Sequence, residues 1–141
     1  MGAETETSWV LLAEDDQALR VLVSSLLTKD GHRVIATGDG DELVLAHAGL
    51  PEGRTRRTVV VSDLAMPNRG GLEACEEIRV QEPNVAFVLM GAFSEVDDET
   101  RAEALNAAIL VKPFELSRLR ALVRALVADP QATASALMGQ H

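Results

Sequence analysis

The chain of 141 residues lacks several features that mark particular classes of protein. Its single cysteine, Cys75, cannot form an internal disulfide, which fits a reducing cytosol. With no tyrosine, three phenylalanines and one tryptophan, it has too few aromatic rings for a surface that stacks nucleic-acid bases. It has no apolar run long enough to cross a bilayer, and its first residues, MGAETETSW, lack the basic start and apolar core of a secretory signal. We therefore expect a cytoplasmic protein with no membrane partner.

Positive charge is scarce as well. Lysine and arginine number 13 against 22 aspartates and glutamates, for a net charge of −9. Because nucleic-acid-binding modules usually present a basic face, we expect no nucleic-acid partner. The hydrophobic share of 47% is ordinary for a globular protein, and the length is that of one domain that buries a core without disulfides.

Short apolar runs alternate with segments of helical periodicity. The pattern predicts strands at residues 9–13, 32–37, 58–62, 85–90 and 109–111, and helices at 17–28, 41–48, 72–82, 97–106 and 115–128. The runs are apolar throughout, which is typical of a parallel sheet covered on both faces. The sequence thus predicts one doubly wound α/β domain over residues 9–128, with a five-stranded parallel sheet. Residues 1–8 and 129–141 are expected to be a flexible lead and tail.

Charged side chains follow three of the expected strands. Three consecutive acids, residues 14–16, come after the first strand, Asp63 ends the third, and Lys112 follows the fifth. In an open parallel sheet, ligands bind outside the carboxyl ends of the strands. Clustered carboxylates repel each other unless a cation compensates, and oxygen ligands favour a hard ion such as Mg²⁺. We therefore expect Asp63 to lie where a metal ion and a lysine neutralise an incoming phosphoryl group.

The segments VLLAEDD, VVVSDLAMP and LVKPF resemble, in their order and spacing, the receiver domain of bacterial two-component response regulators. The resemblance covers residues 9–128 and implies the flavodoxin-like (βα)5 fold. It implies that Asp63 accepts a phosphoryl group from a histidine kinase or a histidine phosphotransfer domain, forming an acyl phosphate. A chain of this kind signals through protein contacts and is not an enzyme in its own right.

The same resemblance assigns roles to other residues of this chain. It implies that Asp15 binds Mg²⁺ directly, that Glu14 holds the ion through water, and that the backbone carbonyl of Ala65 completes the protein's share of ligands. It implies that Lys112 pairs first with Asp63 and then with the phosphoryl oxygens, and that a cis peptide bond precedes proline 113. Kinases and phosphotransfer domains dock near residues 17–28 in this family, and further partners or a second copy bind the face formed by residues 97–106, 109–111 and 115–128.

Two positions depart from the family pattern. Gly91 stands where the family has threonine or serine, so one charge-assisted hydrogen bond to the phosphate, worth roughly 1.5–3 kcal/mol, is missing. Ile109 stands where the family has an aromatic ring that swings inward on activation. Ser94 offers a partial substitute for the hydroxyl, and Asn106 is expected to supply the left-handed residue before the last strand. We expect phosphate acceptance to be retained and the usual relay to be absent.

Alternative interpretations remain open at this stage. The chain is either a phosphorelay acceptor, with apolar Ala65 and Phe93 favouring a long-lived phosphoryl group, or a phosphate-independent interaction module with a vestigial acidic pocket. An aspartate-nucleophile phosphatase is disfavoured, because such enzymes carry a second acid where Ala65 stands, and a flavin site lacks its aromatic residues. Asp16 is expected to cap a helix, Cys75 to be a packing residue, and the histidines at 32, 47 and 141 to form no metal site.

Overall fold

The structure is a computed structural model that describes residues 8–54 and 56–128. The strands are β1 (Trp9–Ala13), β2 (Arg33–Thr37), β3 (Val59–Asp63), β4 (Ala86–Gly91) and β5 (Ala108–Val111). The helices are α2 (Gln17–Lys29), α3 (Gly40–Ala48), α4 (Gly71–Gln81), α5 (Asp98–Ala104) and α6 (Leu116–Ala128). Every element expected from the sequence is present, and the observed ends differ from the expected ones by at most two residues.

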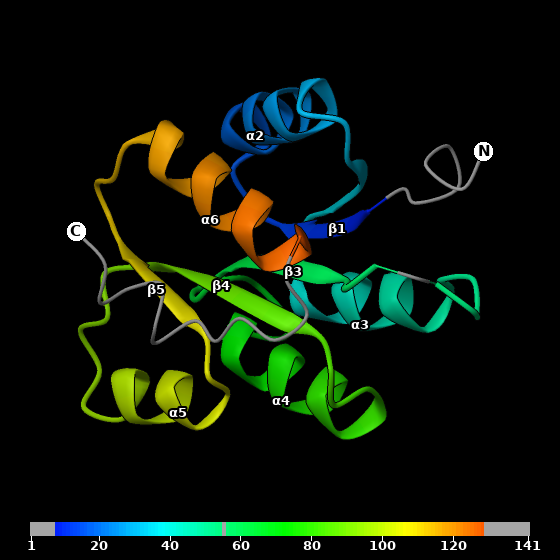
Figure 1. Cartoon of the computed structure of the whole chain (residues 1–141). Helices are drawn as coiled ribbons and strands as arrows, with labels where there is room; N and C mark the ends of the chain where they lie inside the picture. Colours follow the sequence, from blue (N-terminus) through cyan, green and yellow to red (C-terminus); the bar gives the residue numbers. More distant parts are fainter. Residues whose placement is uncertain (1–7, 55, 129–141) are drawn as a thin grey trace.

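The five strands form one parallel sheet in the order β2-β1-β3-β4-β5. Helices α2 and α6 cover one face of the sheet, and α3, α4 and α5 cover the other (Figure 1). This arrangement confirms the expected doubly wound fold. The strand order reverses around β1 and β3, and in such sheets the crevice at that switch point is where ligands bind.

Each face of the sheet has its own apolar core. Val10 and Leu12 of β1 pack with residues of α2 and α6, whereas Leu11 and Ala13 point to the opposite face, toward α3 and α4. Cys75 is fully buried in the second core, as expected for a packing residue, and burial raises the pKa of its thiol well above the ordinary range. No helix in the described part of the chain is both long and apolar enough to cross a membrane.

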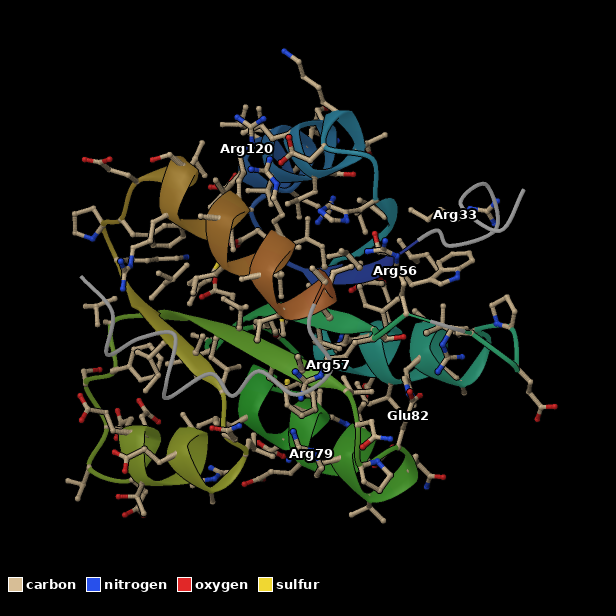
Figure 2. All side chains as sticks on the ribbon, viewed as in Figure 1. Arg33, Arg56, Arg57, Arg79, Glu82 and Arg120 are labelled. Carbon is tan, nitrogen blue, oxygen red and sulfur yellow. The ribbon has the colours of Figure 1, made fainter. Side chains whose placement is uncertain are left out.

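Local side-chain contacts set where the elements begin and how they are joined. Asp16 caps α2, as predicted, by accepting a hydrogen bond of 3.0 Å from the backbone of Leu19. Asn106 has a φ of 54°, which confirms it as the left-handed residue before β5. The carboxylate of Asp30, at the end of α2, accepts two hydrogen bonds from Arg120 of α6, at 2.6 and 2.9 Å. Figure 2 labels Arg120 where α6 lies next to α2.

The start of β1 is fixed by a buried pair. Ser8 is buried, although the sequence assigned it to the flexible lead, and its hydroxyl lies 2.5 Å from Nδ1 of His32. The rest of the expected lead, residues 1–7, and the expected tail, residues 129–141, lie outside the described residues. Nε2 of His32 has no hydrogen-bond partner among the described residues. Burial lowers the pKa of His32; the nearby charge of Asp30 opposes this shift, and those of Arg124 and Arg56 add to it.

We expect this histidine to weaken the fold in mild acid. Because its pKa is lower in the folded chain, the unfolded chain binds more protons just below pH 6.5, so the free energy of unfolding falls as the pH drops through about 6.5. Urea unfolding at about pH 7.5 and 5.5 should show a larger loss for the wild type than for His32→Gln. Glu14 is present in both proteins, so its contribution to the pH dependence of stability cancels when the two losses are compared. Equal losses in the two proteins would contradict the prediction.

Candidate functional site

Three carboxylates from two neighbouring strands meet at the carboxyl edge of the sheet. Glu14 and Asp15 directly follow β1, and Asp63 is the last residue of β3, the strand paired with β1. One oxygen from each residue lies within 4.8 Å of the other two. Glu14 is 1% and Asp63 6% exposed, whereas Asp15 is open to solvent. The structure therefore brings together the three acids that the sequence singled out.

Lys112 completes this cluster from the end of β5. Its Nζ lies 3.1 Å from Oδ2 of Asp63 and 3.6 Å from Oε1 of Glu14. Its backbone N–H donates to the carbonyl of Gly91 at 2.9 Å, which fixes the chain beside β4. The Lys112–Pro113 peptide bond is cis, as the resemblance implied. An ammonium from a third strand end thus faces both buried acids.

The charges of the cluster are only partly compensated. Burial raises the pKa of Glu14, and the charge of Asp63 raises it further. A 3.1 Å hydrogen bond from the backbone of Asp16 and the charge of Lys112 lower the pKa of Glu14 but do not cancel the increase. Burial alone would lower the pKa of Lys112, but its contacts with Asp63 and Glu14 outweigh that effect and raise it. One lysine therefore serves two buried carboxylates.

The donor set suits a hard divalent cation. All the side-chain donors are carboxylate oxygens, the ligand type that Mg²⁺ prefers. Oε1 of Glu14 is buried and accepts no hydrogen bond in the described part of the chain, so it retains capacity for another partner. A cation here would also relieve the repulsion between the carboxylates. The residues present therefore fit the expected ion.

Asp63 lines a small cavity of about 370 Å³. Its Oδ1 accepts a hydrogen bond from the backbone of Leu64 at 3.0 Å, and its Oδ2 faces Lys112. Ala65 lines the cavity beside Asp63, and Phe93, in a left-handed conformation with a φ of 53°, lines it from the loop after β4. The cavity beside Asp63 is thus lined by one cation and several apolar side chains, together with the polar side chains of Ser94, Glu95 and Asp98.

The structure also places the two residues at which the sequence departs from the expected pattern, Gly91 and Ile109, in β4 and β5. Gly91 ends β4, and a Cβ there would lie 2.9–3.2 Å from side-chain atoms of Leu64, so Leu64 covers the place of a threonine side chain. Ser94 is exposed at the rim of the same cavity. Ile109 is half-buried and packs against the core on the α3–α5 face.

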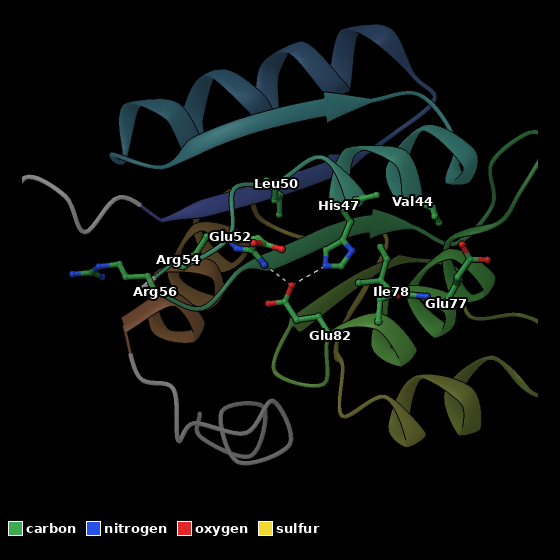
Figure 3. A pocket seen from close by; sticks show the side chains of 12 residues that line it. Val44, His47, Leu50, Glu52, Arg54, Arg56, Glu77, Ile78 and Glu82 are labelled. Carbon is green, nitrogen blue, oxygen red and sulfur yellow. Dashed lines mark hydrogen bonds and ion pairs between the residues drawn. The ribbon is translucent and has the colours of Figure 1, made fainter.

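The structure also contains features that the sequence reasoning missed. Nη1 of Arg20, in the first turn of α2, donates to the backbone carbonyl of Glu14 at 2.8 Å and so steadies the acidic turn. A larger cavity of about 780 Å³ lies between α3 and α4, where Glu82 accepts hydrogen bonds from His47 and Arg54 (Figure 3). Its lining shares no residue with the Asp63 cavity. No sequence pattern pointed to either feature, because both join residues from different elements.

Comparison with known proteins gives a consistent assignment. Residues 10–124 match the family model described as the response regulator receiver domain. The chain is 39% identical over 116 residues to the response regulator protein FleR of Pseudomonas aeruginosa, covering 81% of this chain and 23% of that protein. It is 36% identical over 113 residues to the transcriptional regulatory protein PdtaR of Mycobacterium tuberculosis, covering 78% and 52%.

Solved structures agree on the fold. The non-phosphorylated HemR receiver domain of Leptospira biflexa superposes with a TM-score of 0.73 at 25% identity, covering 87% of this chain and 96% of that one. The chemotaxis response regulator CheY4 of Vibrio cholerae gives a TM-score of 0.71 at 23% identity, covering 86% and 99%.

The match therefore extends over most of this chain and over only part of its curated relatives. The chain spans 23% of FleR and 52% of PdtaR. The matched segment itself contains every acid of the cluster and Lys112. The family-model match, the sequence identity and the fold together show that the chain belongs to the response regulator receiver domain family.

Proposed function

We propose that the chain accepts a phosphoryl group on Asp63 from a histidine kinase or a histidine phosphotransfer domain, and signals through protein contacts. The observation that carries the proposal is the convergence of Glu14, Asp15 and Asp63, with one oxygen of each within 4.8 Å of the others and Nζ of Lys112 3.1 Å from Asp63 and 3.6 Å from Glu14. In this proposal Glu14, Asp15, Asp63 and the backbone carbonyl of Ala65 hold Mg²⁺. When bound, the ion supplies positive charge to the phosphoryl oxygens.

The chemistry expected of these residues is phosphoryl transfer by positioning and charge neutralisation. A carboxylate oxygen of Asp63 attacks phosphorus, an acyl phosphate bond forms, and the bond between phosphorus and the donor's imidazole nitrogen breaks. The leaving imidazole then takes its proton from solvent. Lys112, already 3.1 Å from Oδ2 of Asp63, follows the new charge onto a phosphoryl oxygen.

Incubation with acetyl phosphate and Mg²⁺ tests the proposal against a phosphate-independent interaction module. We expect intact-mass measurement to find one added phosphoryl group on the wild type and none on Asp63→Asn, which keeps the size of the side chain but removes its charge. Failure of the wild type to gain phosphate, with Mg²⁺ binding checked by calorimetry, would favour the interaction module. Phosphate retained by Asp63→Asn would place the acceptor elsewhere.

We expect the phosphoryl group to persist for minutes or longer. Ala65 and Phe93, which line the cavity around Asp63, have no side-chain group that orients an attacking water. The decay of label from the purified phosphoprotein measures this lifetime, and Ala65→Asn, which adds an amide at the cavity, should shorten it. Hydrolysis of the wild type within seconds would contradict the prediction and weaken the case for a relay acceptor.

Two exposed apolar surfaces support the proposed partner contacts. On α2, the helix that follows the turn carrying Glu14 and Asp15, Val21 and Leu22 are 58% and 46% exposed, and in this proposal the phosphoryl donor docks on that helix. On the side of β5, Val96 and Val111 are 94% and 52% exposed, on the face proposed for a downstream partner or a second copy. With glycine at 91 and isoleucine at 109, neither the hydroxyl nor the ring of the usual relay is available to that face.

A further inference from the structure

The loop that follows Asp63 is tied to the start of α3 by side-chain contacts. Nδ2 of Asn68 donates to Oδ2 of Asp39 at 2.6 Å. The other oxygen of Asp39 caps α3 by accepting the backbone N–H of Glu42 at 2.9 Å. One carboxylate therefore holds both the loop and the first turn of the helix, and both hydrogen bonds lower its pKa.

Arg69 makes the second set of contacts from the same loop. Its Nε lies 2.9 Å from Oδ1 of Asp41 on α3, and its Nη1 lies 2.8 Å from Oε1 of Glu77 on α4. Its backbone carbonyl accepts the N–H of Gly40 at 3.0 Å. Side chain and backbone thus link the loop to two helices, and we call the contacts of Asn68 and Arg69 with Asp39, Gly40, Asp41 and Glu77 the loop clamp.

The loop clamp acts on a short segment that begins at the acceptor residue. Only residues 64–67 separate Asp63 from Asn68, and the N–H of Gly71 closes the loop on the carbonyl of Leu64 at 3.0 Å. Asn68 holds a left-handed conformation with a φ of 67°, which fixes the direction of the chain between Ala65 and α4. Only Met66 and Pro67 therefore lie between Ala65 and the loop clamp.

We propose that the loop clamp couples the Asp63 site to the first turn of α3, with Asn68 and Arg69 as positioning residues for the Ala65 carbonyl. The inference rests on the proposed function. It gives the site a route into α3 and α4 that uses neither position 91 nor position 109. Coupling between two sites is reciprocal. If the intact loop clamp raises the affinity of the Asp63 site for the cation, binding of the cation must stabilise the intact clamp by the same factor.

The geometry of the Asp39–Asn68 bond allows a matched set of variants. Asn68→Gly removes the amide but tolerates the left-handed backbone, so it tests the bond without adding strain. Asn68→Asp places a second carboxylate against Asp39 and adds repulsion. In the exchange Asp39→Asn with Asn68→Asp, the new amide at position 39 still caps the helix through its oxygen and donates to the new carboxylate. Arg69→Ala removes the ion pairs with Asp41 and Glu77, and Arg101→Ala, which removes an arginine paired with Glu76 instead, is its control for lost surface charge.

Calorimetric titration with Mg²⁺ measures the first half of the proposal. We expect Asn68→Gly to bind Mg²⁺ about fivefold more weakly than the wild type, and Asn68→Asp more weakly still. The exchanged pair should recover to within about twofold of the wild type, as a double-mutant cycle for a direct contact requires. Melting temperatures are recorded for each variant, because a purely structural role would change stability but not affinity.

Hydrogen exchange measures the second half. With Mg²⁺ and beryllofluoride as a stable phosphoryl mimic, we expect changed protection of the first-turn amides of α3 in the wild type and in Arg101→Ala. In Asn68→Gly that change should be lost, although the mimic still binds. Wild-type affinity in Asn68→Gly, or an α3 response that survives in it, would overturn the inference. Failure of the wild type to bind Mg²⁺ or the mimic would instead overturn the proposed function.

Discussion

The substitution Gly71→Ala is expected to destabilise the protein by about 3 kcal/mol or more. A Cβ at Gly71 would lie 2.0 Å from the backbone carbonyl oxygen of Asp63 and 2.7 Å from Oγ of Ser62. The first neighbour is backbone, so rotation of a side chain cannot relieve the overlap. Strand β3 and α4 must move apart, and Asp63, the last residue of β3, must move with the strand. Urea unfolding at constant pH measures the loss.

Gly49→Ala is the matched control for this change. Gly49 follows α3 with a φ of −87°, and a Cβ there would meet nothing closer than 3.7 Å. Alanine fits that backbone and restricts the unfolded chain, so the control should be unchanged or stabilised by up to about 1 kcal/mol. Equal stabilities of Gly71→Ala and Gly49→Ala would mean that α4 does not approach Asp63 as closely as described.

The substitution Lys112→Ala is expected to affect both stability and phosphorylation. It leaves Glu14 and Asp63 buried with no cation beside them in the described structure. Breaking a fully buried pair typically costs 3–5 kcal/mol, and because the Lys112 side chain is 36% exposed we expect a loss nearer to about 2 kcal/mol without divalent cation. Phosphorylation by acetyl phosphate should slow about a hundredfold, as for loss of one group that stabilises transition-state charge.

Added Mg²⁺ separates the electrostatic explanation from simple loss of packing. An ion bound to the carboxylates replaces part of the missing positive charge, so the stability gap between Lys112→Ala and the wild type should narrow at millimolar Mg²⁺. Lys29→Ala, at the exposed end of α2, removes the same charge and should do nothing comparable. A gap that Mg²⁺ leaves unchanged would show that the lysine does not act by neutralising the acids.

The strand-end acids were predictable from sequence because the fold converts chain order into position. Apolar runs predicted the strands, and the carboxyl ends of parallel strands share one edge of the sheet. That reasoning placed Glu14, Asp15 and Asp63 together, and the structure confirms it. Lys112 follows the same logic from β5. The helix cap at Asp16 and the left-handed conformation of Asn106 were predictable because they depend on only a few neighbouring residues.

Contacts between distant segments were not predictable in this way. The contact by which Leu64 covers the place of a side chain at Gly91 could not be predicted, because the two residues are 27 positions apart and neither stands in an unusual sequence pattern. The bond between Asp39 and Asn68 is likewise a matter of tertiary geometry. Polar loop residues have many alternative partners, so spacing alone does not select among them.

The most direct measurement of the central claim is the position of a bound divalent cation. Crystals soaked in Mn²⁺, which takes the same oxygen ligands as Mg²⁺ and scatters anomalously, would locate the ion. We predict one strong anomalous peak in contact with carboxylate oxygens of Asp15 and Asp63 and the carbonyl of Ala65, with Glu14 behind it. A fully soaked crystal with no peak between β1 and β3, or with its ion bound elsewhere on the chain, would contradict the proposed site.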